Sequence, residues 1–157
     1  MRRKDRAITD PHAIAGTLAS QNVCRVALHG EPYPYIVPLN YGMVREGERI
    51  TLYMHCAHEG EKLRRMQANA HVAFEVDDGG QLMEQADGCN YTMLYESVMG
   101  CGTLRVVEGE EKRVGLLALM HQIAPEKTFA FSDDQVNTVT MLRLDVEQMT
   151  GKRHRNA

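Results

Sequence analysis

Residues 71–77 read His-Val-Ala-Phe-Glu-Val-Asp, and this stretch decides the fold class. Val72, Phe74 and Val76 share one face of an extended chain, while the residues between them share the other. Such alternation is typical of a strand that buries one face, as strands of antiparallel sheets commonly do. The stretch therefore predicts an antiparallel strand with His71 on its polar face.

Five further segments have strand character, and the connections between them are short. One of them is long and is expected to bend at Gly100 and Gly102. The predicted strands are 23–28, 35–41, 49–55, 71–76, 91–107 and 138–146, and the predicted helices start at Asp10-Pro11 and cover 60–69 and 110–122. Six such strands predict a mainly β protein, an antiparallel barrel with peripheral helices, in one domain spanning residues 1–157.

Composition excludes several classes of protein. A net charge of −3 gives no global attraction to nucleic acid or to an anionic membrane. No stretch approaches the roughly 20 apolar residues of a membrane helix, so we expect a soluble, cytoplasmic chain. The four cysteines (Cys24, Cys56, Cys89, Cys101) are scattered and are expected to be free thiols. No dinucleotide fingerprint, P-loop, H-E-x-x-H or G-x-S-x-G motif is present, which disfavours the enzyme classes that use them.

Residues 35–41, Tyr-Ile-Val-Pro-Leu-Asn-Tyr, form the first candidate cluster. Pro38 cannot donate to a strand ladder, so this strand has an edge, a bulge or a ligand beside it. Beside Asn40 and Tyr41, unpaired backbone groups could contact a planar heterocycle. The alternative is an ordinary edge strand.

The second cluster, residues 55–62, runs from a strand end into a helix start. A helix N-terminus attracts anions, and His55 and Lys62 could add donors around a phosphate. A metal site through His55, Cys56 and His58 is disfavoured because the spacing lacks the paired pattern of structural zinc sites. A plain surface turn is the remaining alternative.

The third cluster is Glu96-Ser97-Val98-Met99-Gly100-Cys101-Gly102. Small residues let a ligand approach the backbone closely, although a bare barrel corner needs the same glycines. His71 is also ambiguous, because a histidine on a polar strand face is often merely exposed.

Taken in order, several stretches resemble one family along nearly the whole chain. They are residues 1–6, 24–28, 33–42, 55–62, 71–77, 95–102 and 150–153. The chain resembles the flavin-nucleotide-binding split barrels related to pyridoxamine phosphate oxidase, and in particular their nitroimidazole-resistance branch. One departure from the family pattern is Tyr91, where relatives often carry tryptophan. Because of this difference the resemblance does not identify the substrate.

The resemblance implies a split β-barrel that forms a homodimer with two FMN molecules at the interface. A barrel this small is filled by its own side chains, so a flavin must lie outside it. The implied FMN-binding residues are Val37, Pro38, Leu39, Asn40 and Tyr41 at the ring, His55, Glu59, Gly60 and Lys62 at the phosphate, and Ser97, Gly100, Lys152 and Arg153 along the groove. The resemblance also makes His71 the implied catalytic residue, which hydrogen-bonds a substrate oxygen or supplies a proton. No metal is implied.

The function expected from the resemblance is an FMN-dependent oxidoreductase that reduces small acceptors such as nitroaromatic, nitroimidazole-like compounds. One alternative is a flavin-binding or sensing protein without fast turnover. Another is a haem-binding barrel with His71 or His154 as the axial ligand. Pyridoxamine phosphate oxidation is disfavoured, because it needs a second cationic pocket and the only further basic cluster is residues 152–155.

Overall fold

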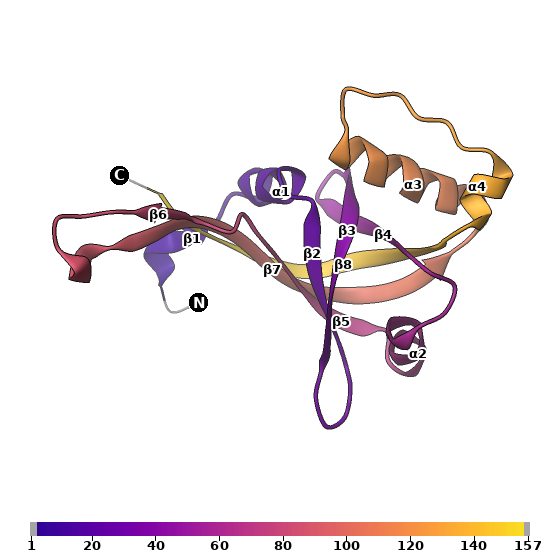
Figure 1. Cartoon of the computed structure of the whole chain (residues 1–157), viewed down its shortest axis with the longest axis horizontal. Helices are drawn as coiled ribbons and strands as arrows, with labels where there is room; N and C mark the ends of the chain where they lie inside the picture. Colours follow the sequence, from indigo (N-terminus) through magenta and orange to yellow (C-terminus); the bar gives the residue numbers. More distant parts are fainter. Residues whose placement is uncertain (1–2, 156–157) are drawn as a thin grey trace.

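Six antiparallel strands close into a barrel in the computed structural model, which describes residues 3–155 (Figure 1). The strands are β2 (Val23–Leu28), β3 (Tyr35–Glu46), β4 (Arg49–Cys56), β5 (His71–Asp77), β7 (Thr92–Val107) and β8 (Thr140–His154). They pair in the order β8-β4-β3-β2-β5-β7, and a further β7–β8 pairing closes the ring. The predicted fold class is therefore confirmed.

The remaining elements lie around this barrel. They are the strands β1 (Ala7–Ile8) and β6 (Gln81–Met83), the helices α1 (Pro11–Ala19), α2 (Glu61–Ala68), α3 (Gly109–Ile123) and α4 (Asp133–Asn137), and the 3-10 turns η1 (Lys4–Arg6) and η2 (Gly88–Asn90). The helix start predicted at Asp10-Pro11 is confirmed, because the Asp10 carboxylate accepts a hydrogen bond of 2.9 Å from the backbone N–H of His12. None of the helices within residues 3–155 has the length and apolar character needed to cross a bilayer.

The barrel interior holds the main core. Alternate residues of each strand point inward, so Val26 of β2 pairs with Phe74 of β5, and both are at most 2% exposed. Helix α2 closes one end of the barrel by burying Leu63 and Met66 in the same core. The barrel is thus filled by its own side chains, and any ligand of flavin size must bind outside it.

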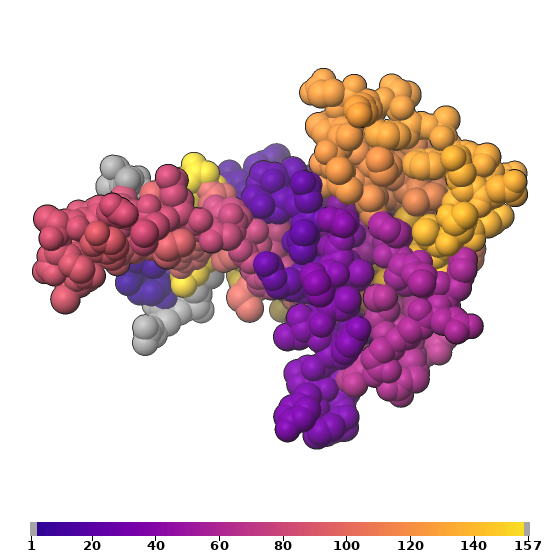
Figure 2. Space-filling model, viewed as in Figure 1, coloured from indigo at the N-terminus to yellow at the C-terminus, as the bar shows by residue number. Residues whose placement is uncertain are grey.

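Beyond the barrel, β7 and β8 continue as a long antiparallel arm (Figures 1 and 2). Their register runs from Val107 opposite Met141 to Tyr95 opposite His154, with β1 added to β8 and β6 added to β7. The sequence prediction ended the last strand at 146 and placed a loop over 77–90, so it missed the end of β8 and the whole of β6. Past Val146 the strand buries no continuous face, and the alternating pattern that marks a strand is lost.

Helix α3 covers the outer side of β3 and β4. It packs so closely that a methyl group built on Gly42 would lie 2.2 Å from the backbone of Ala118 and Leu119. Tyr53, Val107 and Met141 form a second buried cluster beneath this helix. The outer sides of β2, β5 and β7 have no such helix over them (Figure 1).

Candidate functional site

The outer sides of β2, β5 and β7, with residues 35–40 of β3, form a flat surface that we call the open face. Its first cross-strand row is Ile36, Ala27, Ala73 and Cys101, and its second is Pro38, Arg25, Glu75 and Met99. Ile36 is 62% exposed and Met99 is 61% exposed. The open face therefore offers small and apolar side chains beside the ion pair of Arg25 with Glu75, and a planar group or another protein surface can lie on it.

His71 stands at one end of the open face. It is the first residue of β5, and its backbone N–H donates a 2.9 Å hydrogen bond to the Asn69 side chain, which fixes the start of the strand. Its ring is exposed, and the next residue on the same side of the strand is Ala73. An imidazole here can reach a ligand lying over the small residues beside it.

The predicted ring-binding residues divide between the two sides of β3. Pro38 and Asn40 are on the open face, whereas the side chains of Val37, Leu39 and Tyr41 point into the barrel. Tyr41 is fully buried and its hydroxyl donates to the Leu18 carbonyl at 2.5 Å, while burial raises the pKa of the phenol. Strand alternation therefore lets only Pro38 and Asn40 offer side chains on this side, and it leaves the backbone of Val37, Leu39 and Tyr41 for a ring.

Backbone contacts at this strand remain available. Tyr41 is the first residue of β3 that pairs with β4, so within the described chain residues 35–40 pair with β2 alone. Alternate backbone groups of that segment face away from β2. Pro38 lies in this half-paired segment, as its missing N–H predicted.

The predicted phosphate-binding residues also divide. His55 lies on the outer side of β4 and lines a cavity of about 270 Å³ under α3, beside Leu119 and Phe131. Glu59, Gly60 and Lys62 stay together at the start of α2. Placing His55 with the phosphate end is therefore wrong, because the chain turns away after β4 before α2 begins.

The N-terminus of α2 can bind an anion. Gly60 has a φ of +143°, which residues other than glycine rarely adopt. The Leu63 N–H donates to the Gly60 carbonyl at 3.1 Å, which leaves the N–H groups of Glu61 and Lys62 for an anion. Glu61 pairs with Arg64 and Arg65, which neutralises its charge. Lys62 lies close enough to Cys56 to lower the pKa of that thiol, although burial raises it by more.

The three residues weighed as a metal site do not converge. Cys56 points into the core, whereas His55 points outward. The His58 Nε2–H donates to the Asn137 carbonyl at 3.0 Å, and Nδ1 accepts from the Thr140 hydroxyl at 3.1 Å. No group of three His, Cys, Asp or Glu side chains suited to a metal ion occurs within residues 3–155.

Of the remaining predicted residues, Ser97 and Lys152 share the open face's side of the arm, where they are cross-strand neighbours. Gly100 points inward, and a methyl group on it would lie 2.5 Å from the Phe74 ring. The need for a glycine at this position is therefore explained by core packing. Only the backbone of Gly100 is available to contact a ligand.

Arg153 follows Lys152 on β8 and therefore points to the other side of the arm. Its Nε is 2.8 Å from Glu96, a carboxylate only 12% exposed that also pairs with Arg155 and accepts from the Thr17 hydroxyl at 2.9 Å. The structure thus gives Arg153 a structural ion pair and does not bring it together with the other predicted FMN-binding residues.

Glu96 makes the stability of the arm depend on pH. Burial raises the pKa of this carboxyl, but hydrogen bonds from Thr17, Arg153 and Arg155 outweigh burial, so the pKa lies below its ordinary 4.5. A lowered pKa stabilises the folded state above the unfolded pKa, and this contribution is lost as pH falls through the folded pKa.

Replacing Glu96 by Gln is therefore expected to destabilise the protein most at neutral pH. The difference in unfolding free energy from wild type should shrink below about pH 4.5, as urea titrations at pH 7 and 3.5 would show. Glu110, 84% exposed beside Arg113, is the matched control, and its Gln variant should change little at either pH. An equal E96Q penalty at both pH values would refute the role of the charge.

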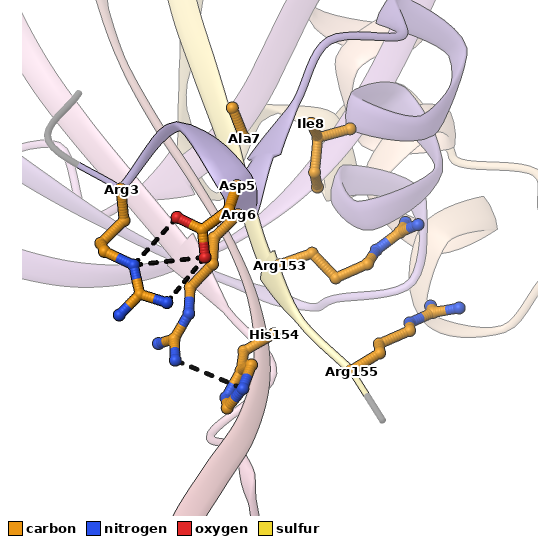
Figure 3. Close-up of a pocket in the computed structure, with 8 residues that line it drawn as sticks. All are labelled: Arg3, Asp5, Arg6, Ala7, Ile8, Arg153, His154 and Arg155. Atoms are coloured by element: carbon orange, nitrogen blue, oxygen red, sulfur yellow. Dashed lines mark hydrogen bonds and ion pairs between the residues drawn. The ribbon is translucent and has the colours of Figure 1, made fainter. Parts of the chain in front are cut away.

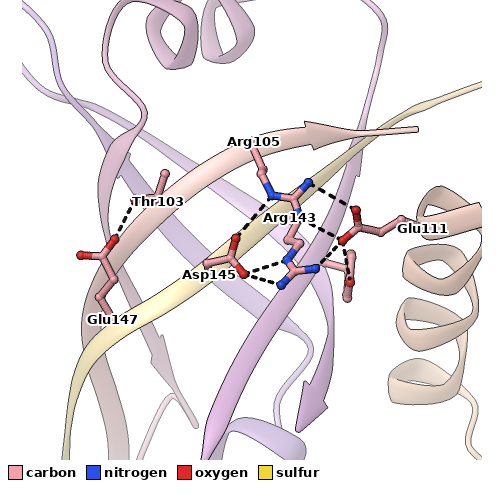
Figure 4. Close-up of polar contacts among 7 residues, drawn as sticks. Thr103, Arg105, Glu111, Arg143, Asp145 and Glu147 are labelled. Atoms are coloured by element: carbon pink, nitrogen blue, oxygen red, sulfur yellow. Dashed lines mark hydrogen bonds and ion pairs between the residues drawn. The ribbon is translucent and has the colours of Figure 1, made fainter. Parts of the chain in front are cut away.

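Two residues missed by sequence reasoning lie near His71. Thr103 is its cross-strand partner on β7, and the Thr103 hydroxyl donates to Glu147 at 2.7 Å (Figure 4). Glu147 is the extra residue of a bulge where the register slips between Cys101 and Gly102, and such bulges re-aim side chains beside functional sites. The bend predicted at these glycines was the only signal in the sequence.

A separate charged network lies between this pair and α3 (Figure 4). Glu111 on α3 binds Arg105 and Arg143, and Arg143 also donates to Asp145 at 2.7 Å. Hydrogen bonds from Arg143 and Arg105 keep the pKa of Glu111 below its ordinary value. The network joins the start of α3 to β7 and β8. Glu147 is not part of it and accepts a hydrogen bond from a hydroxyl group instead of pairing with an arginine.

Comparison with solved structures gives three informative neighbours. A "putative 5-nitroimidazole antibiotic resistance protein" from Bacteroides thetaiotaomicron is 34% identical, with a TM-score of 0.80 over 93% of this chain and 85% of that one. An FAD and heme binding protein from Mycobacterium smegmatis (20% identity, TM-score 0.82, coverage 96% and 74%) and an FAD-binding protein from Mesorhizobium loti (21%, 0.68, 96% and 98%) share the fold. No curated protein sequence matches.

The family comparison agrees with the fold. The profile described as pyridoxamine 5'-phosphate oxidase matches residues 10–153, from the cap of α1 through to β8. That range includes every barrel strand, the open face and the start of α2. This chain therefore belongs to the pyridoxamine 5'-phosphate oxidase family.

Proposed function

We propose that this protein is a flavin-dependent oxidoreductase that reduces small acceptors such as nitroaromatic compounds. The observation that carries the proposal is the placement of His71, which is exposed at one end of the open face, two residues along β5 from Ala73. The relative that is 34% identical carries a name tied to nitroimidazole resistance, which favours a nitro group as the acceptor.

The residues present fit FMN as the cofactor. Gly60 and Lys62 at the α2 N-terminus would hold its single phosphate, and the small-residue row of the open face would support its ring. Pro38, Asn40, Ser97 and Lys152 lie on the same outer side and would contact it there. The flavin, when bound, supplies the transfer of electrons between a donor and an acceptor.

The protein's own part in the reaction is to bind, orient and protonate. One reduced nicotinamide and one proton convert a nitro group into a nitroso group, with oxidised nicotinamide and water as the other products. His71 would donate a hydrogen bond or a proton to the nitro oxygen as electrons arrive. Ile36 and Met99, farther along the open face, would add apolar contacts to a bound ring.

We also propose that a second copy of the chain covers the open face and completes the flavin site. Ile36 and Met99 are exposed there, and Leu82 and Met93 extend the apolar surface along the arm. Exposed apolar patches of this kind mark interaction sites. Light scattering on a sizing column should give twice the monomer mass of 17.7 kDa, and a monomer would refute this part of the proposal.

The first test is an absorbance spectrum of freshly purified protein, before and after anaerobic NADH or NADPH. Flavin bands that bleach, followed by oxidation with a nitroimidazole, would support the reductase. Flavin bands that persist with every donor would favour a binding or sensing protein. A Soret band would show haem instead, and of the two ligands considered it favours His71, because both ring nitrogens of His154 already have partners.

A further inference from the structure

A cavity of about 400 Å³ lies between the N-terminal segment and the end of β8 (Figure 3). Four arginines, a histidine and a single carboxylate line it, and Arg153 and Arg155 extend on the opposite side of β8 from His154 and Arg6 (Figure 3). The lining residues are Arg3, Asp5, Arg6, Ala7, Ile8, Arg153, His154 and Arg155. Within the described chain β1 pairs only with Gly151 and Lys152, so the cavity lies where β8 runs on past its neighbour.

The positive charge in this cavity is only partly balanced. Arg3 pairs with Asp5 at 2.6 Å, and Arg153 and Arg155 share the one carboxylate of Glu96. Among residues 3–155 no carboxylate oxygen lies within 4 Å of Arg6. The cavity and its immediate surroundings thus hold four guanidinium groups for two carboxylates.

Arg6 and Arg153 each have a buried Nε without a hydrogen-bond partner among the described residues. The Arg153 Nε lies 2.8 Å from the Glu96 carboxylate, whereas Arg6 pairs with no carboxylate within those residues. The Arg6 Nη2 is 3.3 Å from Nε2 of His154, whose Nδ1 is 2.8 Å from the Met93 carbonyl oxygen and therefore carries the ring proton. His154 is then a neutral acceptor that orients Arg6 without neutralising it.

We propose that this cavity binds the phosphate group of a small phosphorylated molecule, with Arg6 as its principal ligand. Guanidinium groups match the oxygens of phosphate with paired, charge-assisted hydrogen bonds, and an anion would supply the acceptor that Arg6 lacks. The cavity exceeds the volume of one phosphate, and Ala7 and Ile8 offer apolar contact for the organic part of the ligand. This site is separate from the α2 N-terminus and does not depend on the proposed reductase activity.

Calorimetric titration of the flavin-loaded protein with pyrophosphate tests the site. Wild type should bind, and Arg6→Gln should weaken binding by about tenfold or more, the size expected for a charged hydrogen bond. Arg49→Gln, at an exposed arginine where β4 begins, is the control and should bind like wild type. Equal affinities for all three proteins, or no heat with wild type, would overturn the proposal.

Two further measurements remove ambiguity. If Arg6→Gln unfolds, the NMR signals of the His154 ring nitrogens in wild type provide the readout, since an anion bound to Arg6 must shift the Nε2 signal. Unchanged signals at saturating pyrophosphate would overturn the proposal.

NADPH and NADH then distinguish the sources of the phosphate. Tighter binding of NADPH that Arg6→Gln abolishes assigns the site to the extra phosphate of that donor, whereas equal affinities beside pyrophosphate binding assign it to a free phosphorylated metabolite.

Discussion

Replacing His71 by asparagine is expected to lower the rate of nitroimidazole reduction at least a hundredfold while the flavin stays bound. General acid catalysis by a positioned side chain is typically worth 10² to 10⁴ in rate, and asparagine keeps a hydrogen-bond donor but cannot transfer a proton at neutral pH. His71 is exposed on the open face and makes no side-chain contact within the core, so the fold should tolerate the change. Single-turnover reoxidation of the reduced flavin by the acceptor is the measurement.

His121→Asn is the matched control for this variant, because His121 is an exposed histidine in the last turn of α3. It should reoxidise at the wild-type rate. A His71→Asn rate within about threefold of wild type, with full flavin content, would remove His71 from the chemistry and leave it as a surface residue.

The barrel was predictable because its strands bury one face each. The alternation in residues 71–77 follows from that constraint, and it correctly predicted the strand β5. The glycines near residue 100 correctly predicted the irregularity in β7. The arm was not predictable in the same way. Its strands bury no continuous face, so Gln81–Met83 becomes extended only by pairing with Thr92–Leu94, and residues 147–154 only by pairing with the distant β7.

The candidate site was predicted in part. Neighbours on a strand point to opposite sides, which divides residues 37–41, and the turn between β4 and α2 separates His55 from residues 59–62. Thus Pro38 and Asn40 lie outside the barrel while Val37, Leu39 and Tyr41 lie inside, and His55 is directed under α3. The arginine cavity joins the two ends of the described chain, so no local pattern could reveal it.

Replacing Gly42 by alanine is expected to lower the free energy of unfolding by roughly 3 kcal/mol, the upper end of the usual cost of overpacking. The new methyl group would stand 2.2 Å from the α3 backbone at Ala118 and Leu119, so the helix itself would have to move away from β3. For a chain of this size such a loss lowers Tm by about 6 to 12 °C. Thermal unfolding followed by circular dichroism measures it.

The comparison that isolates this contact is Gly16→Ala. Gly16 lies inside α1 with nothing within 4 Å of the added methyl, so alanine there should stabilise the helix by up to about 1 kcal/mol. The two substitutions add the same atom and should move Tm in opposite directions, because one methyl meets a packed helix backbone and the other meets open space. If both variants melt at the same temperature, α3 does not sit on Gly42 as the structure shows. The side of the barrel assigned to this helix, and with it the extent of the open face, would then have to be redrawn.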